Sequence, residues 1–116
     1  MKRFLLGFLL AAATLAAHHG FAAFDTNSVV TYQGGVTDFH FVNPHSVVEF
    51  EVQGELWKVE LSSAGRLAAK GLTAASLEAG DMVTVSGYRA RNGARSLWAT
   101  KMVLPNGRSL DFVGDR

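Results

Sequence analysis

The sequence predicts a small, mainly β protein with five to six strands and one short helix between the third and fourth strands. Apolar and polar residues alternate with period two in several stretches, and glycine- or proline-containing turns separate these stretches. One alanine- and leucine-rich stretch interrupts the alternation. This order fits the OB-fold, a five-stranded, partly open Greek-key barrel. We therefore expect an OB-fold-like barrel, preceded by a signal peptide helix.

The first predicted strand is long and bent. Residues 29–42 are rich in β-branched and aromatic side chains, and only Gly34-Gly35 interrupts them. Paired glycines inside a strand indicate a bulge or a sharp bend, which would let one strand curve through two sheets. Asn43-Pro44 ends the strand, because proline has no N–H for the ladder and restricts the residue before it.

Caps and turns predict the remaining elements. Ser62 or Ser63 can cap a short helix that runs through Lys70, and Gly71 ends that helix. Asn92-Gly93 predicts a hairpin, because both residues tolerate positive φ. The strands expected around these features are residues 47–52, 56–61, 82–88, 95–104 and 108–113.

Residues 1–17 have the parts of a secretory signal peptide: a charged start, a short apolar stretch and small residues before the exit. A membrane-spanning helix needs about 20 apolar residues, and the polar His18-His19 pair arrives too early for that. Cleavage after Ala16 or after Ala17 fits the pattern, and a cut after Ala13 would leave a short tail. We expect a periplasmic or secreted protein with no stable membrane span after processing.

The mature chain divides into an irregular lead-in, residues 18–28, and the barrel domain, residues 29–116. Removal of the signal lowers Lys+Arg from 11 to 9 against 10 Asp+Glu, so the mature net charge is near −1. This charge gives no overall electrostatic attraction to nucleic acid. Cysteine is absent, which excludes both disulfides and thiolate chemistry.

Several stretches together carry a family resemblance: HHGFAAFD, YQGGV leading to FVNPH, WKVEL, LEAGDMVTVSGYRARNGAR and LPNGR. They resemble a family of small exported bacterial proteins of unknown function, whose members show HHSFA, G-V, W-x-NPH, PGD-VTV-GYRA and LPDGR. The resemblance implies an OB-like periplasmic domain without an established activity. It carries the family histidines onto His18, His19 and His45, and it gives His40 no counterpart. Gly20 replaces the usual serine, and Phe41 replaces the usual tryptophan.

The histidines provide the sharpest functional hypothesis. If cleavage exposes His18, its α-amine and imidazole form a bidentate clamp, and His19 or His45 can add a nitrogen. If cleavage exposes Ala17, the amine and the two following histidines again form a nitrogen-rich chelator. Such donors suit Cu(II) or another late first-row transition metal.

A structural role for the same residues is the competing interpretation. His45 follows Asn43-Pro44 directly, so its ring could satisfy backbone groups of the turn, and the N-terminal pair could be a solvated tail. His40 shares a face with Val36 and Val42 in a regular strand, which favours an edge or lateral structural role over ligation. Met82 and Met102 lie in strands and are expected in the core.

A second candidate is a basic loop formed by Arg89, Arg91 and Arg95. In an OB-fold this loop borders the usual ligand face, so three guanidinium groups could hold an anionic glycan, a phosphate or an acidic partner. A solvated basic hairpin is the plain alternative. Trp57 and Trp98 could stack on a ligand, although packing in the barrel wall is the expected use of both.

The sequence contains no nucleophile elbow, P-loop, zincin motif or cysteine nucleophile. The first hypothesis is therefore an exported, non-enzymatic module that binds a metal, copper for preference, through His18, His19 and His45. The alternative is a periplasmic adaptor that recognises an envelope protein or anionic ligand, with structural histidines. The oligomeric state stays open.

Overall fold

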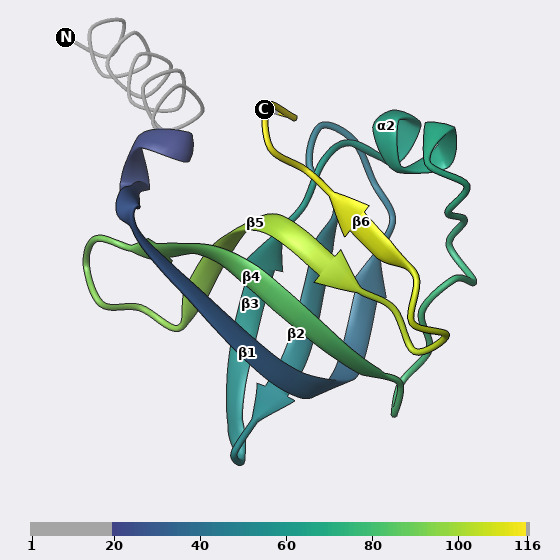
Figure 1. The fold of residues 1–116 in the computed structure, drawn as a ribbon, viewed down its shortest axis with the longest axis horizontal. Helices are drawn as coiled ribbons and strands as arrows, with labels where there is room; N and C mark the ends of the chain where they lie inside the picture. The colour runs from purple at the N-terminus through teal and green to yellow at the C-terminus, as the bar shows by residue number, and fades with distance from the viewer. Residues whose placement is uncertain (1–19, 116) are drawn as a thin grey trace, which may run out of the picture.

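A computed structural model of the chain describes residues 20–115 (Figure 1). The predicted signal peptide and two of the candidate ligands, His18 and His19, lie outside the described residues. The described elements are η1 (Phe21–Ala23), β1 (Phe24–His40), β2 (Val47–Val52), β3 (Glu55–Glu60), α2 (Ala64–Ala69), β4 (Met82–Ala90), β5 (Ser96–Val103) and β6 (Ser109–Asp111). Their order is the predicted one, with the helix between the third and fourth strands.

The strands form one six-stranded sheet that closes on itself. Its order is β3-β2-β1-β4-β5-β6, and an additional pairing joins β3 to β5. That pairing is parallel and sets Val59 beside Leu97. Because β1 to β5 each pair with two of one another, they form a ring, and β6 extends it beyond β5. The mainly β prediction is confirmed.

β1 is the strand around which the ring is built. It pairs antiparallel with β4 through residues 24–35 and with β2 through residues 35–40, so one strand serves two neighbours (Figure 1). Gly34 lies where β1 passes from one neighbour to the other. A Cβ on Gly34 would overlap the carbonyl oxygen of Glu51 and lie 2.8 Å from the Phe50 ring. The predicted bend therefore depends on close backbone contact at this glycine.

Two details of β1 differ from the sequence-based expectation. The strand begins at Phe24 rather than at Val29, so it includes half of the expected irregular lead-in. The register shifts lie between Asp25 and Val29 and between Val36 and Asp38, not at the glycine pair. Each shift breaks the period-two alternation, and the shift between Asp25 and Val29 is why the sequence pattern did not reveal the start of the strand.

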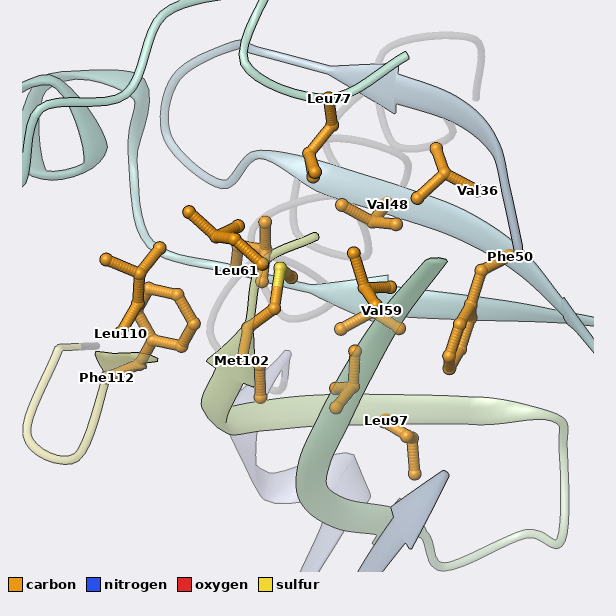
Figure 2. Packing of buried hydrophobic residues seen from close by; sticks show 14 of the residues in the cluster. Val36, Val48, Phe50, Val59, Leu61, Leu77, Leu97, Met102, Leu110 and Phe112 are labelled. Atoms are coloured by element: carbon orange, nitrogen blue, oxygen red, sulfur yellow. The ribbon is translucent and has the colours of Figure 1, made fainter. Parts of the chain in front are cut away.

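The core fills the interior of the ring (Figure 2). Val48, Val59 and Leu97 are fully buried, and Trp57 and Trp98 are packed into the barrel wall as expected. Burial of one such aliphatic side chain stabilises a protein by about 1.5–3 kcal/mol. Met102 is in the core as predicted. Met82 is not, because it starts β4 at the outer surface and is 51% exposed.

The ends of α2 follow the predicted chemistry, and the turns do so in part. In the loop between β4 and β5, Gly93 has positive φ but Asn92 does not. Gln53 and Gly54 both have positive φ and connect β2 to β3. Ser63 caps α2, since its Oγ accepts a hydrogen bond from the Arg66 N–H at 3.2 Å. Gly71 follows the helix with φ +89°, as a helix-ending glycine should. No helix within residues 20–115 is both long and apolar enough to cross a membrane.

The C-terminal segment is attached to α2 through one carboxylate. Asp115 accepts hydrogen bonds from Ser62 Oγ at 3.0 Å and Arg66 Nη1 at 3.2 Å, and Lys70 Nζ lies 3.3 Å from it. Burial alone would raise the pKa of the Asp115 carboxyl, but the Ser62 hydroxyl and the charges of Lys70 and Arg66 outweigh it. The pKa is therefore held below its ordinary value of 3.8.

Replacement of Gly34 by alanine should destabilise the fold by about 1–3 kcal/mol, because the new Cβ meets backbone that cannot move freely. Gly35→Ala is the matched control. Its Cβ would lie 3.7 Å from the Met82 sulfur, an ordinary contact, and should change the free energy of unfolding by no more than about 0.5 kcal/mol. Urea unfolding of both variants tests the difference; equal losses would contradict the steric explanation.

Asp115→Asn should lower the free energy of unfolding at pH 7 by about 1–3 kcal/mol, since the carboxylate accepts charge-assisted hydrogen bonds. A carboxyl with a lowered native pKa stabilises the fold above its unfolded pKa and loses this effect as the pH falls through the native pKa. The variant and the unsubstituted protein should therefore converge below pH 3.8. Asp111→Asn is the control, because asparagine can still accept the hydrogen bond from Val113 N. A pH-independent difference for Asp115→Asn would refute the assignment.

Candidate functional site

The loop between β1 and β2 holds His45 in a defined position. Asn43-Pro44 is a cis peptide bond, and Ser46 behind it is completely buried. Ser46 Oγ donates to the Val42 carbonyl at 3.0 Å and accepts from the Val42 N–H at 3.1 Å. The Ser46 N–H bonds the Ser62 carbonyl at 3.0 Å, so the loop is fixed to the residues that precede α2.

The His45 ring packs against Trp98 of β5. The two rings are 5.2 Å apart between centroids at an interplanar angle of 66°. His45 Nδ1 is buried and has no hydrogen-bond partner among the described residues. The competing interpretation made this ring a partner for backbone groups of the turn. It is the Ser46 hydroxyl that bonds the Val42 backbone, and His45 Nδ1 takes no part.

The lead-in reaches the same tryptophan. Phe21 contacts the Trp98 ring edge-on at 5.0 Å, and Phe24 contacts it at 5.6 Å. Arg91 binds the backbone of this segment. The Arg91 main-chain N–H donates to the Ala23 carbonyl at 2.8 Å, and Arg91 Nε donates to the Ala22 carbonyl at 3.1 Å. Phe21 and His45 thus pack against one indole, although they are far apart in sequence.

The position of Phe21 is relevant to the prediction that His18 meets His45. His18 precedes Phe21 by three residues, and three residues of extended chain span at most about 11 Å. A small hollow adjoins the same aromatic cluster, lined by Phe21, Tyr88, Trp98, Ala99, Thr100, Phe112, Val113 and Gly114. Phe21 of the lead-in and His45 therefore share Trp98 as a packing partner.

His40 lies in a different environment from the one predicted for it. Its Nε2 is 3.7 Å from Glu49 Oε1, and the donor atoms of Asp38, His40 and Glu49 all lie within 4.8 Å of one another. The inference that His40 shares a face with Val36 is wrong, because the register shift between Val36 and Asp38 turns the later residues over. The Asp-x-His spacing was a visible signal for this group, but regular alternation gave no reason to pair it with Glu49.

The three arginines of the predicted basic loop have separate partners. The Arg89 guanidinium carbon lies 5.5 Å from the centre of the Trp57 ring, Arg91 holds the lead-in, and Arg95 forms an ion pair with Glu55. Arg89 belongs to β4, whereas Arg91 and Arg95 lie in the loop between β4 and β5. In the described contacts, each of the three guanidinium groups therefore has a different partner.

Comparison with known proteins supplies a family and a fold neighbour. A comparison with curated proteins gave no match. Among solved structures, apo TiaS, a tRNAIle2 agmatidine synthetase, is similar with a TM-score of 0.52 and 16% identity over 69% of this chain. The match covers only 18% of the TiaS chain, and at this identity it shows a shared fold alone. A family model matches residues 7–98, so the chain belongs to the family of unknown function DUF6152.

Proposed function

We propose that this chain is an exported, non-enzymatic protein that binds copper or another late first-row transition metal through His18, His19 and His45. One observation carries the proposal: His45 presents a buried Nδ1 without a partner among the described residues, on a loop fixed by Ser46. A buried polar atom without a partner costs about 1–3 kcal/mol. A bound metal ion would supply the missing partner.

The chemistry of the donors supports a late transition metal. Imidazole nitrogen is the commonest protein ligand for such ions, and nitrogen-rich sites bind Cu(II) most strongly among the divalent first-row metals. The lead-in supports the same assignment, because Phe21 packs on the indole that His45 also contacts. Cleavage after Ala16 or Ala17 would add the α-amine as a further nitrogen donor.

The alternative, a periplasmic adaptor that recognises a protein or anionic ligand through Arg89, Arg91 and Arg95, has less support. An anionic ligand would need the three guanidinium groups to converge. Arg95 would have to leave Glu55, and Arg91 would have to release the backbone of the lead-in. We therefore favour the metal site.

The mature protein should bind one Cu(II) ion tightly, and His18→Ala and His45→Ala should each weaken binding of that ion at least about tenfold, equivalent to about 1.4 kcal/mol. Isothermal titration measures the affinity, and quenching of tryptophan fluorescence provides an independent binding curve. Glu51→Gln, an exposed carboxylate of β2, is the control and should leave the titration unchanged. Intact mass must first show whether the chain begins at Ala17 or His18. Binding that ignores both His18→Ala and His45→Ala would rule out the proposal.

His45→Phe separates binding from packing. Phenylalanine keeps an aromatic ring against Trp98 and has no buried nitrogen. With a chelator present to remove metal, the free energy of unfolding of the variant should therefore equal that of the unsubstituted protein or exceed it by up to about 3 kcal/mol. Copper affinity should fall in the same variant. Urea unfolding and copper titration of one preparation provide both values. A loss of stability above about 1 kcal/mol would instead show that the imidazole is structurally needed.

A further inference from the structure

A second group of metal-ligating side chains lies on the outer face of β1 and β2. Val36 pairs with Phe50 and Phe39 pairs with Val48, and all four side chains contribute to the core or pack against it. Thr37 is the additional residue at the register shift between Val36 and Asp38. β-bulges of this kind re-aim side chains and are over-represented beside functional sites.

The bulge brings three donors onto one face. Beyond Thr37, Asp38 stands directly opposite Glu49, and His40 stands opposite Val47. Because residues two apart in a strand share a face, Asp38, His40 and Glu49 project to the same side. Asp38 and His40 are exposed and Glu49 is partly so.

The distances between the donors fit a bound cation. His40 Nε2 and Glu49 Oε1 are 3.7 Å apart, and all three donor atoms lie within 4.8 Å of one another. Ligand atoms held about 2.0–2.2 Å from Zn²⁺ in tetrahedral geometry lie about 3.5 Å apart. The His40–Glu49 pair is already near this spacing, and rotation of the exposed Asp38 side chain can close the rest.

The charges at this place favour a cation. Like charges directly opposite in a strand pair destabilise it, and Asp38 faces Glu49. Lys58 is opposite Glu49 on its other side, but its Nζ lies 3.6 Å from Glu60 Oε1 and forms that ion pair instead. Within residues 20–115, no lysine or arginine forms an ion pair with Asp38. A divalent ion would balance two carboxylates while the imidazole supplies a nitrogen.

We propose that Asp38, His40 and Glu49 form a binding site for a borderline divalent cation of the Zn²⁺ class, with water completing its coordination. One nitrogen and two oxygens are a donor set that zinc accepts. Three protein ligands on two paired strands leave at least one open position towards solvent. The site shares no residue with the proposed copper site and does not depend on it.

The test isolates His40. The mature chain carrying His18→Ala, His19→Ala and His45→Ala retains His40 as its single histidine, since the sequence has four. Zn²⁺ should bind it 1:1 and shift the ring resonances in histidine-selective NMR. Asp38→Asn and Glu49→Gln should each weaken binding at least about tenfold, while Glu51→Gln, an exposed carboxylate on the same strand, should leave it unchanged. Absence of a ring shift up to about 1 mM Zn²⁺, a concentration at which even weak extracellular Ca²⁺-binding modules are occupied by their ion, would overturn the proposal.

A second comparison remains decisive if the triple variant does not fold. Among variants of the otherwise unsubstituted mature chain, Glu49→Gln should weaken the binding of one Zn²⁺ ion at least about tenfold, and Glu51→Gln should leave every Zn²⁺ affinity unchanged. Equal Zn²⁺ affinities in these two variants would contradict the proposal. Zn²⁺ binding that persists in His45→Ala but is lost in His40→Ala would support this site even if the copper proposal failed.

Discussion

The fold depends on the double pairing of β1. This one strand supplies hydrogen bonds to β4 along its first part and to β2 along its second part, and the passage between the two requires the bare backbone of Gly34. If β1 could not bend there, β2 and β3 would not reach β5, and the parallel pairing of β3 with β5 would not form. The interior that buries Phe50 and Leu97 exists because that ring closes.

Trp98 connects the closed ring to the candidate metal site. Its indole is packed in the barrel wall, and it contacts Phe21 and Phe24 from the lead-in and His45 from the loop after β1. A buried aromatic residue offers a large, rigid contact surface. Segments at the two ends of β1 are thereby held against one side chain of β5.

The element order and the two ends of α2 could be predicted from local sequence signals. Ser63 and Gly71 behave as local chemistry requires. The start of β1 and the orientation of His40 could not be predicted. Both lie beyond a register shift, and a shift is set by pairing with a distant strand. The packing of His45 on Trp98 also depends on tertiary contact, so the sequence could nominate His45 as a ligand but could not show its surroundings.

The bulge at Thr37 determines whether Asp38 and His40 lie on the same outer face as Glu49. Side chains alternate along a strand, so the length of chain between Val36 and Asp38 decides which of two neighbours faces water and which faces the core. Insertion or deletion of one residue at that point would turn Phe39 towards water and His40 towards the core. The outer group of donors is therefore governed by insertion and deletion as much as by substitution. Relatives that differ by one residue in this strand would present a different outer surface on the same barrel.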